Sequence, residues 1–449
     1  GGDSLAAHAS AGYGSWRTSA VSGGASGGSG GWRFGLDGGH KQSAGFNAIA
    51  NPDNPSFNSD RDGYRQDDAA GNLAYRFAPE QEWSARFLRS RLDAQFDAGP
   101  GFDDRTITTV ESYALAGRNR LTPFWTSRIE AAETGDRSDS RTGFGPSRFT
   151  TRQRLYAWQS DFALPRGALA LALERREERV GGDAGFAVTS RDTDAVVGVY
   201  RLNEGGQALQ VNLRLDDSTQ YGTRTTGALA YGYRLSPAWR ASASYGTAFK
   251  APTFNDLYFP GFSNPELRPE TAKSAEAALR YAQDGIAAGI VAYRNRVRDL
   301  IVFQCDANFD CAPQNVATAT LQGITLEASV YRGQTAIVAS VDLQRPQDDA
   351  SGHLLPRRAR RHAALSVGRP IGPVELTAQL TLSSARFDDA ANTRRMGGYA
   401  LLDLVAEWPF EPHWTAFARL GNLLDKRYEL AADYRTPGAN VFAGIKWLY

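Results

Sequence analysis

The stretch ALQVNLRLD, from Ala208 to Asp216, decides the fold because apolar and polar residues alternate along it. Successive side chains of a β-strand point to opposite faces, so this period separates the two kinds of residue. One face carries Leu209, Val211, Leu213 and Leu215, and the other carries Gln210, Asn212, Arg214 and Asp216. The stretch from Ala400 to Trp408 alternates in the same way. Such strands lie between an apolar and a polar environment, in a membrane barrel or in a soluble sandwich.

The connections between these stretches distinguish the two architectures, because they switch regularly between short and long. Short connections rich in the turn-forming residues Pro, Gly and Asn lie at 27–31, 79–82, 121–123, 164–167, 203–206, 236–238, 283–285, 331–333, 370–372 and 410–412. Longer polar connections lie between them, most clearly at 44–65, 97–106, 136–147, 250–269, 304–314 and 424–437. Short turns therefore share one end of the sheet and long loops the other, which is typical of outer-membrane barrels.

The pattern predicts an all-β fold, a transmembrane antiparallel β-barrel of about 22 strands that are each roughly 10 to 16 residues long. We expect residues 1–449 to form this single domain. The even strand number places both chain ends on the same side of the membrane. Tryptophans near the short turns predict an aromatic girdle at that membrane interface. They are Trp83, Trp125, Trp239, Trp408 and Trp414.

Composition argues against several classes of protein. The chain has 449 residues and a formal net charge of +1, with acids and bases interspersed, so we expect no nucleic-acid partner. No apolar run approaches the roughly 18 residues of a membrane-spanning helix. The five histidines show no metal-ligand spacing, and no Gly-x-Ser-x-Gly motif occurs. We therefore predict that the protein is not an enzyme.

The chain start and the cysteines carry information about processing and compartment. The chain begins Gly1-Gly2-Asp3 and its sole methionine is Met396, which predicts a further segment upstream. Cys305 and Cys311 are the only cysteines and lie close together in a polar loop. This spacing predicts one local disulfide and an oxidising compartment. Two free thiols in a cytosolic protein are the alternative.

Carboxylates gather in the long connections. Four of them flank the turn-forming segment Gly99–Gly101, and two more open the next connection. The first four are Asp93, Asp97, Asp103 and Asp104, and the other two are Asp136 and Asp139. Ca²⁺ takes six to eight oxygen ligands, so the first four are candidate ligands and the other two a second shell or second site. Solvated loop acids without a metal are the alternative.

A dense basic run comprises Arg357, Arg358, Arg360 and Arg361. Guanidinium groups bind phosphates through paired hydrogen bonds, so the run is a candidate site for lipid head groups. A lumenal ladder that pairs with acids of the opposite wall is a second interpretation. A charged strand end near the loops is a third.

Several motifs resemble those of the TonB-dependent outer-membrane transporters. The strand-and-loop stretch Ser244–Pro252 is followed by Leu257-Tyr258 and by the return Asn264–Glu270. Further similar motifs are Gln322–Glu327 and Asn422–Tyr428, with Pro437-Gly438 before the closing strand. Within the family, Ser59–Tyr64 and the acidic loop from Asp93 to Asp104 resemble the vitamin B12 (cobalamin) receptor type, in which the latter is a calcium-binding loop region.

The resemblance implies an active transport receptor in the outer membrane of a Gram-negative bacterium. Cobalamin or a related corrinoid is the expected cargo, and a ferric siderophore is the alternative. The expected partners are outer-membrane lipid and lipopolysaccharide, and TonB through an N-terminal plug domain that should precede Gly1. A barrel of this width is too wide for its own side chains to fill. A passive diffusion pore is a further alternative.

Overall fold

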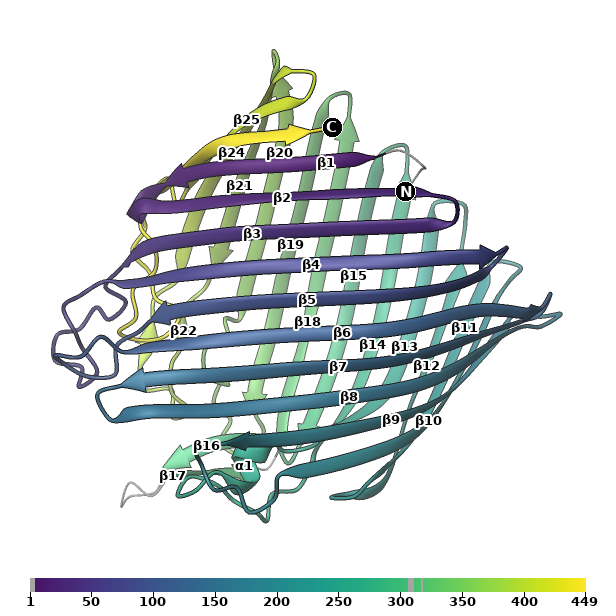
Figure 1. Cartoon of the computed structure of the whole chain (residues 1–449), viewed down its shortest axis with the longest axis horizontal. Helices are drawn as coiled ribbons and strands as arrows, with labels where there is room; N and C mark the ends of the chain where they lie inside the picture. Colours follow the sequence, from purple (N-terminus) through teal and green to yellow (C-terminus); the bar gives the residue numbers. More distant parts are fainter. Residues whose placement is uncertain (1–4, 306–310, 316–317) are drawn as a thin grey trace.

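The computed structural model describes residues 5–305, 311–315 and 318–449. Its main feature is a single sheet of 22 antiparallel strands. Each barrel strand pairs with the next barrel strand along the chain, and the last strand, β26, pairs with the first, β1. Figure 1 shows the purple and yellow ends of the chain side by side in the wall. The predicted closed 22-stranded barrel is therefore confirmed.

The barrel strands of the first half are β1 (Ala6–Gly14), β2 (Thr18–Ser29), β3 (Trp32–Phe46), β4 (Asp62–Ala78), β5 (Gln81–Gln95), β6 (Arg105–Thr122), β7 (Trp125–Thr142), β8 (Gly145–Ala163), β9 (Ala168–Gly182), β10 (Ser190–Glu204) and β11 (Gln207–Ser218). Those of the second half are β12 (Gly222–Arg234), β13 (Trp239–Lys250), β14 (Glu270–Gln283), β15 (Ile286–Arg298), β18 (Thr318–Arg332), β19 (Thr335–Asp348), β20 (Arg361–Ile371), β21 (Val374–Ser383), β24 (Tyr399–Glu411), β25 (Trp414–Gly421) and β26 (Asn440–Leu448).

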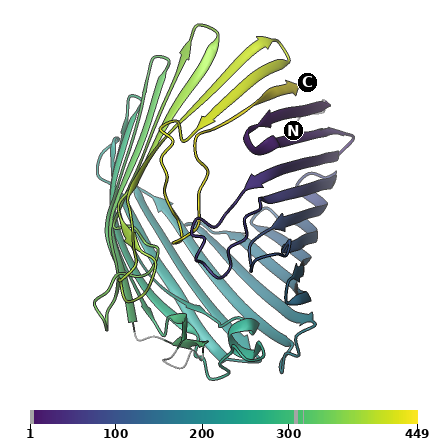
Figure 2. The same ribbon diagram turned by 90° about the vertical axis from the view of Figure 1, so that its left-hand side faces the viewer.

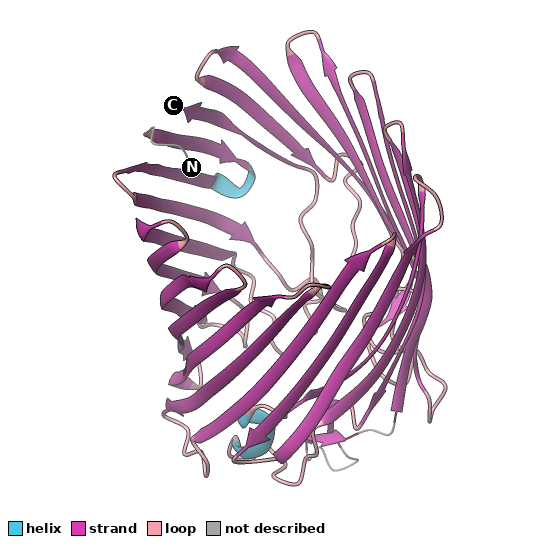
Figure 3. Cartoon of the chain, turned by 90° about the vertical axis from the view of Figure 1, so that its right-hand side faces the viewer, coloured by secondary structure: helices cyan, strands magenta, loops and turns pink. Residues whose placement is uncertain are grey.

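The remaining elements are short and lie in loops. They are the 3₁₀ turn η1 (Ser15–Arg17), the helix α1 (Phe254–Tyr258) and the small hairpins β16 (Ile301–Cys305) with β17 (Cys311–Asn315) and β22 (Arg386–Phe387) with β23 (Arg395–Met396). Figure 3 shows the two helical turns, in cyan, against a wall made of strands. Among the described residues, no helix has the length and hydropathy needed to cross a membrane.

The two ends of the barrel differ as the connection lengths predicted. All ten predicted short turns join adjacent strands, and we call this the turn end. The opposite, loop end carries the long connections 47–61, 96–104, 251–269 and 422–439. The predicted long connection 136–147 is wrong. Strands β7 and β8 continue to a turn of two residues, Gly143 and Phe144, because alternating charged residues extend both strands.

The outer face of the wall carries the apolar members of the alternation. In β11, Leu213 and Leu215 are 61% and 45% exposed, as expected of side chains that face lipid. Aromatic side chains pair across strands near the turn end, with ring centroids 4.4 Å apart for Trp32 and Tyr75 and 5.1 Å apart for Trp239 and Tyr281. The predicted aromatic girdle is therefore present at this end.

The wall is uneven in height. Strands β6, β7 and β8 have 18, 18 and 19 residues, whereas β25 and β26 have 8 and 9. At roughly 3.3 Å per residue, the longer strands exceed the thickness of the apolar layer even when they are tilted. The wall of β6–β8 therefore continues beyond the hydrocarbon at the loop end.

The two cysteines are Cα partners in the small hairpin of β16 and β17. The side chain of Cys305 lies outside the described residues, so the Cys305–Cys311 disulfide stays a prediction.

Glycines permit the closure of the barrel between β1 and β26. Gly12 lies opposite Gly444, and a Cβ atom at Gly444 would lie 2.2 Å from the carbonyl oxygen of Ala11 and 2.7 Å from the Cα of Gly12. The ring of Phe417 would lie 2.8 Å from the same atom. The backbone atoms of β1 cannot move aside as a flexible side chain could. The seam therefore depends on the absence of a side chain at Gly444.

We predict that Gly444→Ala weakens the seam and lowers the free energy of unfolding by about 2 kcal/mol through overpacking. The measurement is urea unfolding of the barrel folded into detergent or lipid. Gly38→Ala is the matched control, because its Cβ would lie 3.7 Å from the nearest neighbouring atom. Equal stability of the two variants would contradict the prediction.

Candidate functional site

Two long loops meet at the loop end and form a contact that we call the loop clasp. Residues 47–61 and 422–439 pair through an antiparallel bridge between Ile49 and Tyr434. The backbone N–H of Ala50 donates to the carbonyl of Asp433 at 2.6 Å, and that of Arg435 donates to Ala48 at 2.7 Å. Ile49 is fully buried. Figure 2 shows the yellow loop running down across the barrel opening to the purple one.

A group of three carboxylates lies next to the loop clasp. Asp60 and Asp62 stand where loop 47–61 enters β4, and Asp97 lies in the loop between β5 and β6. One carboxylate oxygen from each of the three residues lies within 4.8 Å of the others. Because β4 and β5 are paired neighbours, their loop-end extensions bring these acids together.

Asp97 has no neutralising partner in this group. Both of its carboxylate oxygens are buried, and no described residue donates to them in good hydrogen-bond geometry, although the backbone N–H of Asn58 lies near enough to favour the charged form. Burial raises the pKa of the Asp97 carboxyl to about 6, and the negative charge of Asp62 adds to the rise. A buried carboxylate that lacks both a cationic partner and a well-formed hydrogen bond is unfavourable, and a bound cation would stabilise it. The donor set therefore fits a hard cation such as Ca²⁺.

The other three predicted ligands of the acidic loop have protein partners. Asp104 is 2% exposed, and its carboxylate accepts from the backbone N–H of Ala98 at 3.0 Å and of Gly143 at 2.9 Å. Arg105 contacts Asp93 at 3.3 Å and Asp103 at 3.4 Å. Asp104 thus ties the loop that carries Asp97 to the turn between β7 and β8.

Asp136 and Asp139 do not join the group, because they lie within β7 and not in a loop. Asp139 accepts from Arg137 at 2.7 Å and from Arg148 at 2.6 Å. Asp136 alternates with Asp139 in the strand register and points to the opposite face. The hypothesis that these two acids form a second shell or second site is not supported by their positions.

Sequence reasoning missed Asp60 and Asp62 as candidate ligands. The signal for them was present, since both belong to the stretch Ser59–Tyr64 that carries the resemblance described above.

The basic run from Arg357 to Arg361 agrees in part with the third interpretation, a charged strand end near the loops. Arg357 lies in the loop after β19 and pairs with Asp388 at 2.7 Å, and Arg361 begins β20.

We predict that Asp104→Ala loosens the loop 96–104, because the part-buried hydrogen bonds from the backbone N–H groups of Ala98 and Gly143 are lost at a cost of about 1 kcal/mol. Hydrogen exchange at Ala98 and Gly143 should become faster, and Asp104→Asn, which keeps one acceptor oxygen, should show a smaller change. Asp103→Ala is the control, because this carboxylate is 56% exposed. Unchanged exchange in Asp104→Ala would show that the carboxylate does not hold the loop.

Comparisons with known proteins agree with this architecture. The family model described as TonB dependent receptor-like, beta-barrel, matches residues 9–423. The vitamin B12 transporter BtuB of Photobacterium profundum is 27% identical over 411 residues, which are 89% of this chain and 66% of that protein. The vitamin B12 transporter BtuB of Vibrio vulnificus is 27% identical over 407 residues, 87% of this chain and 66% of that protein. The chain thus spans just under two thirds of the length of these relatives.

Solved structures share the fold at lower sequence identity. A mutant of the ferric enterobactin receptor PfeA from Pseudomonas aeruginosa has a TM-score of 0.85 and 16% identity, covering 100% of this chain and 81% of that chain. The siderophore receptor PirA from Acinetobacter baumannii has a TM-score of 0.83 and 15% identity, covering 99% and 80%. Since the family model matches most of the chain, which closes into a 22-stranded barrel, the protein belongs to the TonB-dependent receptor β-barrel family.

Proposed function

We propose that this chain is the barrel of an outer-membrane receptor for active uptake of cobalamin or a related corrinoid. The observation that carries the proposal is the match of 87–89% of the chain to relatives named vitamin B12 transporters. The structural likeness to siderophore receptors supports the fold alone, because its identity is 15–16%. Location in a Gram-negative outer membrane and coupling to TonB through a plug domain are parts of the same proposal.

The loop end is the side on which cargo would be bound. The loop clasp places irregular backbone across the opening, where backbone N–H and carbonyl groups are available to a polar cargo. The lumen-facing side of the wall is also polar, as shown by Arg214, which contacts Glu174 at 2.7 Å and Asp216 at 2.8 Å. A bulky polar molecule would therefore meet hydrogen-bonding groups in the loops and then along the wall.

We further propose that Asp60, Asp62 and Asp97 hold Ca²⁺. The bound ion would order the loops that carry these residues and so support cargo binding. Ca²⁺ bound there would supply the positive charge that offsets repulsion among the three carboxylates. Asp62 also accepts from the backbone N–H of Ala48 at 2.7 Å, which lies in the loop clasp. The carboxylates thus connect the proposed metal site with the loop that contacts residues 422–439.

The cargo proposal predicts saturable binding of cyanocobalamin to the full-length receptor in detergent, with no displacement by ferric enterobactin. Equilibrium binding of each compound, followed by competition with the other, is the measurement. Saturable binding of the ferric siderophore alone would assign the siderophore class. Binding of neither compound, together with large steady conductance in planar bilayers, would assign a passive pore.

The calcium proposal predicts that Asp62→Asn and Asp97→Asn each weaken Ca²⁺ binding to the full-length receptor by about tenfold or more, because each removes a charged ligand. Asp103→Asn is the matched control, because Asp103 belongs to the same acidic loop but pairs with Arg105. Equilibrium dialysis with labelled calcium measures the affinity. If Asp103→Asn weakens binding and Asp97→Asn does not, the ligand assignment is wrong.

The same assay has a pH dependence. With the pKa of Asp97 raised to about 6, its carboxyl is protonated below that pH and unable to bind a cation. The apparent Ca²⁺ affinity should therefore rise by about tenfold between pH 5 and pH 7, as one proton is released on binding. In Asp97→Asn this dependence should be lost.

A further inference from the structure

The lumenal face of β12–β14 carries a row of arginines at the turn end. Arg234 of β12 lies directly opposite Arg240 of β13, which lies opposite Arg280 of β14. This face is lumenal, because Thr226 of β12 is the partner of the lumenal Arg214 and an even spacing separates Thr226 from Arg234. All three arginines are exposed. Like charges directly opposite each other destabilise a sheet, so the row is unfavourable unless an anion meets it.

A cavity of about 250 Å³ lies beside this row and is lined by Arg240 and by a further arginine, Arg201 of β10. Arg201 faces the lumen, because it lies opposite Gln210, which shares a face of β11 with Arg214. The Nε of Arg201 donates to Oε1 of Gln210 at 3.2 Å. Asn203 is also part of the lining. The cavity thus presents guanidinium and amide donors.

Gly232 forms part of the lining and brings one guanidinium close to the wall. A Cβ atom at Gly232 would lie 3.0 Å from Nη2 and 3.2 Å from Nε of Arg240. The backbone of Gly232 does not have a positive φ, so its conformation does not require glycine. What glycine provides at this position is room for the guanidinium of Arg240 against the backbone of β12.

Four arginines of this face form what we call the lumenal arginine cluster, namely Arg201, Arg234, Arg240 and Arg280. None of them makes an ion pair with a residue that the structure describes. Glu327 lies in the row of Arg280, on the side away from the cavity, with Gly289 between them. A Cβ atom at Gly289 would lie 3.6 Å from Cγ of Arg280 and 3.9 Å from Oε2 of Glu327. Glu327 therefore approaches Arg280 and leaves the cavity arginines without an acid.

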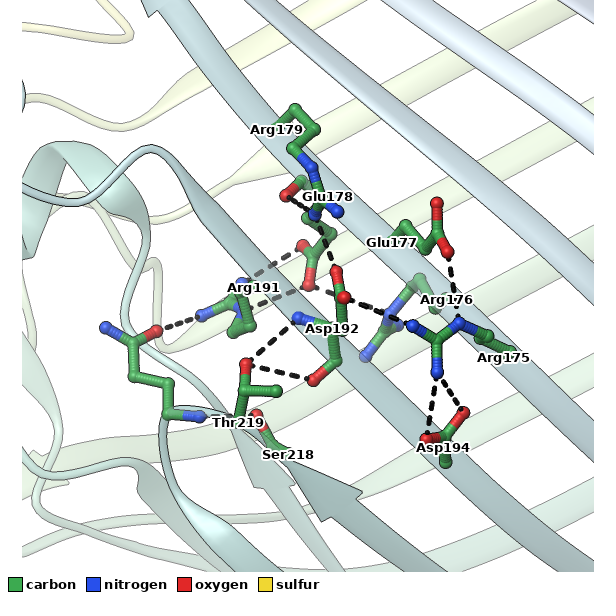
Figure 4. Close-up of polar contacts among 11 residues, drawn as sticks. Arg175, Arg176, Glu177, Glu178, Arg179, Arg191, Asp192, Asp194, Ser218 and Thr219 are labelled. Atoms are coloured by element: carbon green, nitrogen blue, oxygen red, sulfur yellow. Dashed lines mark hydrogen bonds and ion pairs between the residues drawn. The ribbon is translucent and has the colours of Figure 1, made fainter.

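Arginines of β9–β11 nearer the loop end are, in contrast, matched with acids. Figure 4 shows Arg191 donating to both carboxylate oxygens of Glu178, at 2.9 and 3.0 Å. In the same view Arg175 contacts Glu177 at 3.0 Å and Asp194 at 3.2 Å. These pairs neutralise the wall from within. The lumenal arginine cluster lacks such pairs, so its charge is left for another molecule to neutralise.

We propose that the lumenal arginine cluster is a second binding site, for an oxyanion of phosphate chemistry, at the end of the lumen from which cargo would leave. Guanidinium forks bind phosphate oxygens through paired, charge-assisted hydrogen bonds. The assignment of a natural ligand rests on the proposed function: it is the phosphodiester group of cobalamin. The cavity of about 250 Å³ is smaller than ordinary ligand pockets of roughly 300 to 1,000 Å³, so it takes this group and not the whole corrinoid.

The position of the cluster gives it a role in passage and not in capture. A cargo that binds at the loop end has to cross the lumen before it leaves at the turn end. A site along a route has to bind weakly enough to release what it binds. The arginines of the cluster are exposed to solvent, which weakens their contacts with an anion. Loss of the site should therefore slow uptake and leave binding at the loops unchanged.

The test compares the uptake of labelled cyanocobalamin by cells that make the full-length receptor with equilibrium binding to the same receptor. Arg201→Gln combined with Arg240→Gln should lower the uptake rate by about tenfold, because two charged donors are removed, while equilibrium binding stays unchanged. Arg201→Lys with Arg240→Lys keeps the charges but loses the forks, so uptake should fall less. Cobinamide, which lacks the phosphodiester, should enter at the same rate through all these receptors.

Arg33→Gln combined with Arg128→Gln is the matched control. Both arginines lie on the lumenal face near the turn end, since their chain neighbours are exposed apolar residues of the outer face. Each already has an acid partner, because Arg33 pairs with Glu82, and Arg128 contacts Asp161 at 3.0 Å. The control removes two charges from the same end of the lumen, and uptake should stay near that of the unmodified receptor. An equal fall in both double variants would assign the effect to general lumenal charge and overturn the site.

Further results would overturn the proposal. Unchanged cyanocobalamin uptake through Arg201→Gln with Arg240→Gln would remove the cluster from the route, and an equal fall in cobinamide uptake would remove the phosphodiester. Calorimetric titration tests inorganic phosphate, the other source of the same chemistry. Saturable phosphate binding that the double variant loses, together with normal uptake, would assign a free anion. A receptor that binds no cyanocobalamin would contradict the cargo proposal itself, whereas normal binding with unaffected uptake would contradict this inference alone.

Discussion

The structure depends on one constraint, which is that a backbone N–H or carbonyl group inside a hydrocarbon layer must find a partner within the protein. A sheet satisfies this condition only when it has no free edge. The pairing of β26 with β1 removes the two edges, and Gly12 and Gly444 let the strands approach closely enough to pair. The apolar outer face, the polar lumen and the two unlike ends are then consequences of a closed wall in a membrane.

The sequence predicts the barrel well where contact with lipid on one face and water on the other restricts the residue types of the strands. Alternation within strands and Pro, Gly or Asn at the tight turns both follow from it, so the strand number and both ends agree with the structure. The wrong prediction of a long loop at 136–147 arises where the hydrocarbon no longer restricts the residue types. Once β7 leaves the hydrocarbon, Asp139 and Arg137 can point outward into water, and an extended strand then has the composition of a loop.

The acidic site is less predictable, because its composition depends on which acids are neutralised by residues from other strands. Asp104 is satisfied by the N–H of Gly143, at a turn that the sequence does not reveal. Arg105 engages Asp93 and Asp103, although it could equally have faced solvent. What remains is Asp97, which meets Asp60 and Asp62 only because β4 and β5 are neighbours.

The seam between the chain ends also sets an order of assembly. Every other pairing in the sheet joins barrel strands that are consecutive along the chain, whereas the seam joins the two ends of the chain. There the hydroxyl of Ser15 accepts a hydrogen bond from the N–H of Val441, 426 positions away. Hairpins can form while the chain is still being delivered, but the seam needs the complete curved sheet. Until then two open edges are exposed to other chains. We expect the seam to close last and, in a weakened barrel, to open first.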